Sequence, residues 1–174
     1  MKIFITGIAG VGKTTTLSEL QKFGYFVVDL DATGMCVWKN IKTGESTEYG
    51  IYGRDKNWIN EHGWYCNIET LRKLLSCVRK DKDVFVAGIL ENTEDVVLEF
   101  DKVFFLDAPN DVIKQRLLDR TNNHFGKKED EQEAILSFKD QLVKKINNFI
   151  PVDATKTSSE VAKFILDNSV NSNL

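Results

Sequence analysis

Basic residues, cysteine and long apolar runs are all scarce in this sequence of 174 residues. Lysine and arginine number 23 against 26 acidic residues, for a net charge of −3, whereas nucleic-acid-binding proteins usually carry a basic excess. No apolar run approaches the ~18 residues that span a bilayer. The N-terminal run Met1–Thr6 turns at Gly7 and is too short for a signal peptide. We therefore expect a cytoplasmic protein that binds neither nucleic acid nor membrane.

Cysteine is also too rare for a disulfide framework. Cys36, Cys66 and Cys77 are odd in number and widely spaced. His62 and Cys66 could share a metal, but two ligands do not make a site, and free cysteine is usually a small buried apolar residue. Apolar residues make up 42% of the chain, and its length fits one domain. We expect one globular domain without structural zinc.

Strand and helix signals alternate along the chain. Strands are predicted at Lys2–Thr6, Tyr25–Asp29, Val84–Gly88, Lys102–Asp107 and Phe149–Val152. Helices are predicted at Lys13–Phe23, at Asn67–Lys80 with Asn67 as N-cap, at Pro109–Arg120, at Glu129–Phe149, and after a capping box of Thr157 and Glu160. Continuously apolar strands that alternate with helices favour a parallel sheet in a layered α/β fold.

Two segments interrupt this alternation. Asp31–Cys66 lacks clean periodicity and contains Trp38, Trp58 and Trp64, and Thr121–Asp130 is polar. Long irregular segments in compact domains are usually lids or binding loops. A disordered insertion is the alternative for Asp31–Cys66, but its aromatic residues would be costly to leave in water. The aromatic residues form either one wall of an acceptor site or a small satellite core.

A phosphate-binding motif lies between the first strand and the first helix. Residues Gly7–Thr14 match G-x-x-x-x-G-K-[ST] in the strand–helix context that this motif requires. The glycines let backbone N–H groups surround a phosphate, and the helix N-terminus adds partial positive charge. Lys13 is expected to reach the β- and γ-phosphates. The motif predicts a site for a nucleoside triphosphate, most simply ATP with Mg²⁺. The residues predicted to contact it here are Gly7, Gly10, Val11, Gly12, Lys13, Thr14 and Thr15.

Two acids close the second predicted strand. Asp29 and Asp31 follow a buried run, and the carboxyl ends of parallel strands face the ligand crevice in such sheets. One carboxylate would hold Mg²⁺ and the other would accept a proton from an attacking hydroxyl. We assign Asp29 to the metal together with Thr14, and Asp31 to catalysis, although the residues alone leave the reverse assignment open. A turn acid or a helix cap is the alternative for both.

Two arginines share one face of a predicted helix. Arg116 and Arg120 are four positions apart, and Arg120 borders the polar segment. Guanidinium groups suit delocalised transition-state charge and also stack on purines. We predict a catalytic role for both, with a solvated helix edge as the alternative. Asp107, which ends an apolar strand, is interpreted as a cap of the helix near Pro109 rather than as a Walker-B acid.

The sequence resembles the small bacterial P-loop proteins usually labelled "AAA family ATPase" or "shikimate kinase-like", within the nucleoside-monophosphate-kinase-like group. The matching segments cover most of the chain outside Thr33–His62. They are Gly7–Thr14, Asp29–Asp31, Gly63–Trp64 with the helix to Leu75, Ala87–Asn92, Leu106–Pro109, Arg116–Lys127 and Val152–Thr155.

The resemblance implies a three-layer P-loop NTPase fold with a five-stranded parallel sheet of order 2-3-1-4-5. It implies a single domain with a core at about 1–31 and 67–170, a substrate-binding lobe at about 32–66 and a lid at about 121–130. It places the purine near Arg120, Asp153 and Ala154. The acceptor residues that it implies are Asp31, Arg54, Trp64, Gly88, Glu91 and Asn92.

The departures from this family concern the acceptor. Shikimate kinases have a Gly-Gly-Gly turn where this chain has Ala87–Ile89, and they bind the shikimate carboxylate with several arginines. The lobe here offers only Arg54, which disfavours shikimate and nucleoside monophosphates. We expect an ATP-dependent kinase, a monomer or homodimer, that moves the γ-phosphoryl group to a small-molecule or nucleotide acceptor. The alternative is a nucleotide-binding regulatory or sensor ATPase without an acceptor.

Overall fold

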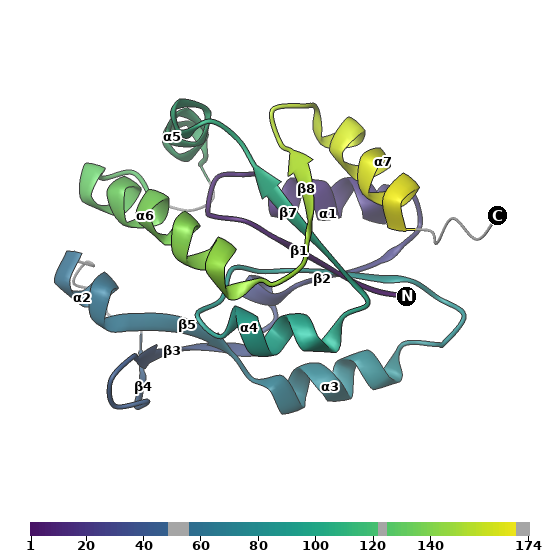
Figure 1. The fold of residues 1–174 in the computed structure, drawn as a ribbon, viewed down its shortest axis with the longest axis horizontal. Helices are drawn as coiled ribbons and strands as arrows, with labels where there is room; N and C mark the ends of the chain where they lie inside the picture. Colours follow the sequence, from purple (N-terminus) through teal and green to yellow (C-terminus); the bar gives the residue numbers. More distant parts are fainter. Residues whose placement is uncertain (49–55, 122–124, 170–174) are drawn as a thin grey trace.

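A computed structural model describes residues 1–48, 56–121 and 125–169 and contains two sheets (Figure 1). The larger sheet is parallel and has five strands. Their spatial order is β2 (Phe26–Asp29), β6 (Val84–Ala87), β1 (Lys2–Thr6), β7 (Lys102–Asp107) and β8 (Ile150–Asp153). Counted along the chain within this sheet, the order is 2-3-1-4-5, which the resemblance implied.

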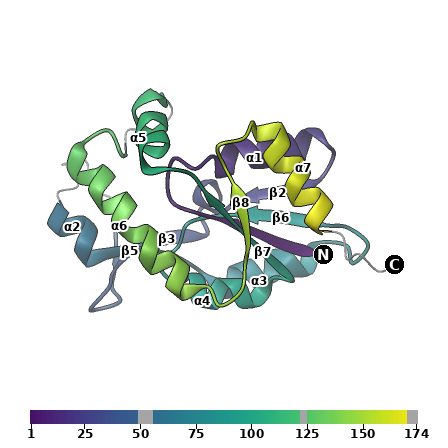
Figure 2. The ribbon, with the colours of Figure 1, turned by 45° about the horizontal axis from the view of Figure 1, so that its top comes forward.

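Helices cover both faces of this sheet. α1 (Lys13–Lys22) and α7 (Ser158–Ser169) lie side by side on one face, and α3 (Ile68–Cys77) and α4 (Thr93–Val96) lie on the other (Figures 1 and 2). Every residue of β6 is buried, and so are four of the five residues of β1. Burial on both faces explains why these strands are continuously apolar and could be predicted. The three-layer α/β fold is thereby confirmed.

Two further helices, α5 (Asn110–Asp119) and α6 (Glu129–Lys145), flank the sheet near the carboxyl ends of its strands. Two short 3-10 turns, η1 (Leu30–Ala32) and η2 (Val97–Glu99), lie elsewhere. The predicted end of α6 at Phe149 was wrong. The backbone is already extended at Ile146, whose side chain is buried, and Phe149 packs its ring 5.1 Å from that of Phe105. The chain must leave the helix there to enter β8.

The second sheet was not predicted. It is antiparallel, with β3 (Cys36–Asn40) between β4 (Ser46–Thr47) and β5 (His62–Cys66), and α2 (Lys56–Glu61) leads into β5. Most residues of β3 and β5 are partly exposed, so neither strand shows the apolar alternation that marks a half-buried strand. The sequence therefore suggested an irregular segment where the structure has strands.

The caps predicted at two helix N-termini are confirmed. The Asn67 side chain accepts a hydrogen bond from the Thr70 N–H at 3.0 Å, and Thr157 and Glu160 form the expected reciprocal capping pair.

The cysteines are free, with Cys36 and Cys66 opposite each other on β3 and β5. Within the described ranges, no group of three or more His, Cys, Asp or Glu side chains could hold a metal ion. None of the described helices is long and apolar enough to cross a membrane.

Candidate active site

The phosphate loop connects β1 to α1 in the conformation that its glycines permit. Gly7, Gly10 and Gly12 have φ values of 142°, 89° and 102°. A Cβ atom at Gly7 would also lie 2.4 Å from the Leu106 carbonyl oxygen, so only glycine fits there. The Thr16 N–H donates to the Gly12 carbonyl at 2.9 Å and opens the helix. The loop thus has the backbone form that a phosphate cradle needs.

Lys13 is buried and folds back over this loop. Its Nζ donates to the carbonyl oxygens of Gly7 at 2.8 Å and Ile8 at 3.3 Å. Burial lowers the pKa of Lys13, and the carboxylates of Asp31 and Asp29 oppose that shift. The ammonium group is therefore held at the loop itself, where an anionic ligand would replace its carbonyl partners.

The first acid after β2 reaches the start of α1. Thr14 Oγ1 donates to Asp29 Oδ2 at 2.8 Å, and Asp29 Oδ1 accepts from the Asp31 N–H at 3.1 Å. The second bond caps η1 and fixes the direction in which the chain leaves β2. A hydroxyl and a carboxylate oxygen this close are the oxygen ligands that Mg²⁺ prefers. These two residues fit the predicted metal.

The second acid faces a different partner. Asp31 Oδ1 accepts a hydrogen bond from the Trp64 indole N–H at 2.9 Å. The side chain is solvent-accessible, yet the surrounding cavity walls raise the pKa of Asp31, and the Asp29 charge adds to the rise. The nearby Lys13 and the Trp64 hydrogen bond oppose it. The structure thus separates the two acids, with Asp29 beside Thr14 and Asp31 in the cavity wall.

Arg116 lies on α5, whereas Arg120 is the extended residue that follows the helix, so the two arginines do not share a helix face and make different contacts. Arg116 donates to the Ala154 carbonyl at 2.9 Å and to the Val11 carbonyl at 3.5 Å, and so connects the phosphate loop to the loop after β8. Arg120 donates to the Phe125 carbonyl, but its buried Nε has no hydrogen-bond partner in the described part of the chain. Burial lowers the pKa of Arg120. A buried donor without a partner is rare in native proteins and suggests that a ligand supplies the acceptor.

One cavity of about 980 Å³ brings most of these residues together. The phosphate loop from Gly10 to Thr15 lines it, together with Asp31, Arg116, Arg120 and Ala154. The second sheet contributes Trp38 and Trp64, and the loop after β6 contributes Glu91. Two sheets and residues from distant parts of the sequence therefore share a single cavity.

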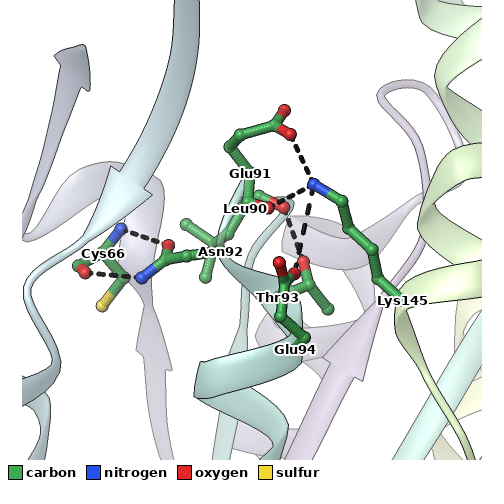
Figure 3. A network of polar contacts seen from close by, with 7 residues as sticks. All are labelled: Cys66, Leu90, Glu91, Asn92, Thr93, Glu94 and Lys145. Carbon is green, nitrogen blue, oxygen red and sulfur yellow. Dashed lines mark hydrogen bonds and ion pairs between the residues drawn. The ribbon is translucent and has the colours of Figure 1, made fainter. Parts of the chain in front are cut away.

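Several predicted site residues lie outside the cavity lining. Gly88 accepts from Thr6 Oγ1 through its carbonyl at 2.9 Å, and Asp153 accepts from the Thr155 hydroxyl and N–H in a local turn. Asn92 makes two 3.0 Å bonds with the Cys66 backbone and so closes the outer edge of β5 (Figure 3). Their substrate or nucleotide roles stay predictions. Arg54 lies outside the described residues.

Other lining residues were missed from the sequence. α6 contributes Phe138 and Gln141, and the loop after β8 contributes Lys156. Phe138 is a partly buried apolar residue of α6, and a helical apolar stripe does not show which of its members border a cavity. Asp107, interpreted as a helix cap, instead pairs with Lys139 at 2.6 Å and accepts from the Ala108 N–H. The cap position of α5 is Pro109.

The parallel sheet and the glycine-rich loop between β1 and α1 are those of a P-loop protein. A family model described as "AAA domain" matches residues 3–137, which is most of the chain. The chain belongs to this family, as the resemblance indicated. No curated protein matches the sequence.

Solved structures with the same fold include several kinases. Shikimate kinase from Acinetobacter baumannii in complex with shikimate is 19% identical, with a TM-score of 0.62 over 99% of this chain and 94% of that chain. Deoxyadenosine kinase from M. mycoides with bound dATP is 16% identical, with a TM-score of 0.54 over 97% of this chain and 99% of that one. YorR protein from Bacillus subtilis, in complex with phosphorylated GDP, is 17% identical, with a TM-score of 0.55 over 97% and 95% of the two chains. At these identities the similarity concerns the fold alone.

Proposed function

We propose that this protein is an ATP- and Mg²⁺-dependent phosphotransferase that moves the γ-phosphoryl group to a small-molecule or nucleotide acceptor. The observation that carries the proposal is the single cavity with the phosphate loop at one end and residues of the second sheet at the other. Its volume of about 980 Å³ is at the upper end of the ~300–1,000 Å³ range of ligand pockets. A nucleotide sensor without an acceptor needs no second, aromatic end.

In this proposal the phosphate loop and the residues around it bind the donor. The N–H groups of Gly10–Thr15 surround the phosphates, and Lys13 exchanges its loop carbonyl partners for β- and γ-phosphate oxygens. Thr14 and Asp29 hold Mg²⁺, which would neutralise charge on the same phosphates. The purine lies beside Ala154, which lines the cavity, and near Asp153, its neighbour in the chain. The close Thr14–Asp29 contact supports the metal assignment.

Asp31 serves as the general base of the transfer. It accepts the proton of the acceptor hydroxyl as the new bond from oxygen to the γ-phosphorus forms and the bond to the β–γ bridging oxygen breaks. The Trp64 N–H holds Oδ1 and so orients the carboxylate. Because the pKa of Asp31 is raised toward neutral pH, the carboxylate can be deprotonated there and still be basic enough to accept a proton. Arg120, through its unpartnered Nε, stabilises charge on the transferred group.

Closure of the cavity is part of the same proposal. We assign residues 32–66 to a substrate-binding lobe and residues 121–130 to a lid, both attached to one core domain. Kinases must keep water from the γ-phosphate, and closing two segments over the site does so. The described part of the lid is tied to α6, since the Gly126 N–H donates to Glu131 Oε2 at 2.8 Å. Movement of α6 would therefore move the lid.

The test is the dependence of ADP release on an acceptor. We expect release to be slow with ATP and Mg²⁺ alone and strongly stimulated by a pool of cellular metabolites, with the Lys13→Ala variant as the inactive control. Turnover that is fast without metabolites and unchanged by them would contradict transfer. It would favour the regulatory or sensor ATPase instead.

A further inference from the structure

We infer that the acceptor is uncharged: a hydroxyl compound with a ring or apolar body and no phosphate or carboxylate group. This inference rests on the proposed phosphotransferase function and specifies its acceptor. It follows from how charge is distributed along the cavity and from one half-buried ion pair in its wall.

The charged residues that line the cavity separate into two sets. The basic ones, Lys13, Arg116, Arg120 and Lys156, come from the phosphate loop, α5 and the loop after β8. The opposite end, here called the acceptor end, is built by the second sheet, α2, α6 and the loop after β6. Among the described residues, this end contributes Glu91 and His62 but no lysine or arginine, and Asp31 lies between the two ends. The His62 ring is already engaged, with its Nδ1 2.9 Å from the Trp58 carbonyl oxygen and its ring stacked on that of Trp58. An anionic acceptor would therefore find no lysine or arginine in the described lining of this end.

Lys145, which is not itself among the lining residues, is already held by Glu91 (Figure 3). Its Nζ donates to both the carbonyl oxygen and the carboxylate of Glu91, and Glu94 lies 4.0 Å away. The side chains of Lys145 and Glu91 are only 20% and 18% exposed. Breaking such a pair leaves a poorly solvated charge without a partner, so Lys145 is not available to bind an anion.

Glu91 is itself fixed in place by the second sheet. Its N–H donates to the Trp64 carbonyl at 2.7 Å, along the outer edge of β5. Gly63, next to Trp64, leaves the space that the Glu91 side chain occupies, since a Cβ atom at Gly63 would lie 2.6 Å from Glu91 Cγ. The carboxylate therefore belongs to the rigid wall of the acceptor end.

The rest of the acceptor end suits an uncharged molecule. Trp38 and Trp64, with ring centroids 5.3 Å apart, and Phe138 from across the cavity offer apolar and aromatic surface. Asn60 and Gln141 offer neutral amides for hydroxyl groups. An anionic acceptor would instead meet the Asp31 carboxylate, with no lysine or arginine of the described lining at this end to offset it, and like charges placed together are strongly disfavoured. The expected discrimination against a matched anion is at least about tenfold.

The first experiment separates metabolites by charge. A small-molecule extract of bacterial cells is passed over a strong anion exchanger, giving an unbound fraction and a fraction eluted with volatile ammonium bicarbonate. Each is incubated with the protein, Mg²⁺ and ATP labelled in the γ-phosphate, and labelled products other than ATP and inorganic phosphate are measured. We expect a product from the unbound fraction that the Lys13→Ala protein does not make.

The outcomes separate this inference from the proposed function. A labelled product made only from the anionic fraction would overturn the uncharged acceptor and leave the phosphotransferase standing. Absence of a labelled product from both fractions would contradict the phosphotransferase itself. Production from the unbound fraction supports both.

The second experiment tests Glu91 with Glu94 as a matched control. Glu94 is exposed and lies 4.0 Å from the same lysine, so Glu94→Gln removes an equal charge without releasing Lys145. Candidate acceptors are compared as pairs that differ in one anionic group, such as adenosine with its monophosphate and methyl shikimate with shikimate. We expect Glu91→Gln to raise the binding or kcat/KM ratio of anionic to uncharged member about tenfold, and Glu94→Gln to change it less than about twofold.

Thermal unfolding and binding of ADP identify any Glu91→Gln protein that fails to fold. In that case Lys145→Gln, which removes the cation and leaves Glu91 unpaired, is expected to lower the same ratio. An unchanged ratio in a folded variant would overturn the role of Glu91 in acceptor selection.

Discussion

The two ends of the cavity are built from different kinds of structure. The nucleotide end is made mainly of backbone from one contiguous loop between a buried strand and a buried helix face. The acceptor end is made of side chains from β3, β5, the loop after β6 and α6, which are far apart in the sequence. A site made of backbone groups depends on a few glycines, whereas the ligand preference of a site made of side chains can change with each substitution. The first end therefore identifies the class of protein and the second decides its substrate.

The two ends also differ in how completely their polar side chains are hydrogen-bonded within the protein. At the nucleotide end Lys13 is buried, and Arg120 is half-buried with a buried Nε; a ligand would replace the hydrogen bonds of Lys13 and complete those of Arg120. At the acceptor end Glu91 is already satisfied by Lys145, and Asn92, its neighbour in the chain outside the lining, is satisfied by the Cys66 backbone. The nucleotide end thus has donors for an anion, whereas Glu91 at the acceptor end already has a hydrogen-bond and ion-pair partner within the protein.

Lys13→Ala tests the nucleotide end and has the largest expected effect. The ammonium group is the buried cation of the phosphate loop, so its loss should reduce ATP turnover by at least about 10³-fold. The fold should persist, because the hydrogen bonds of this side chain to the described residues go to carbonyl oxygens of the loop itself. Steady-state turnover and circular dichroism provide the check, with exposed Lys22→Ala on the same helix as control. Near wild-type turnover would refute the phosphate-loop assignment.

Asp31→Asn tests the junction between the two ends. The change keeps the size of the side chain and removes its basicity, so transfer at saturating acceptor should fall about 10²–10⁴-fold. ATP affinity, measured by calorimetry, should stay close to wild type, because Asp29 and Thr14 remain. If the rate at saturating acceptor were unchanged, Asp31 would be a turn residue and no base.

Alanine substitutions of Arg116 in α5 and of Arg120 just after it should differ in their effects on activity and on stability. Arg120→Ala should lower transfer by about tenfold to a hundredfold, since its unpartnered Nε is expected to meet the ligand. Arg116→Ala should cost less activity but about 1–2 kcal/mol of unfolding free energy, because it connects Val11 and Ala154. Turnover and thermal midpoints of both variants decide this. The reverse pattern would assign catalysis to Arg116.

The pH dependence of activity and of stability tests Asp31, which lies between the two ends of the cavity. Because the base must be deprotonated, activity should fall as pH drops through a pKa above the ordinary carboxyl value, and Asp31→Asn should lack this limb. For stability the sign is opposite: a raised folded-state pKa gives a contribution that is present at low pH and lost as pH rises. Asp31→Asn should therefore not lower the thermal midpoint at neutral pH. A clear loss of stability there would contradict the raised pKa.

Tryptophan emission tests the acceptor end and has the smallest expected effect. Trp38 and Trp64 line the cavity, while Trp58 stacks on His62 with centroids 4.3 Å apart and is not among the lining residues. ATP alone should change emission little, and the active metabolite fraction should change it clearly. Trp64→Phe should reduce that change more than Trp58→Phe. Flat emission under a ligand that calorimetry shows to bind would mean that the cluster is only a rigid core.

The sequence by itself determined the parallel sheet and the phosphate loop. β1, β6 and β7 are buried on both faces, so their composition is continuously apolar, and the loop motif is contiguous because neighbouring backbone groups surround one phosphate. Asn67 and the Thr157–Glu160 pair were predictable for a related reason, since a cap acts within one helical turn. Each of these features is local.

The tertiary structure alone decided how the acceptor end is assembled. Trp64 reaches Asp31 across 33 positions of sequence, and Lys145 reaches Glu91 across 54. The strands of the second sheet are partly exposed and carry no periodic apolar signal, so neither their pairing nor their position beside α6 could be predicted. Charge selection by an ion pair depends on which side chains become neighbours when the chain folds, and no pattern within either segment specifies that partner.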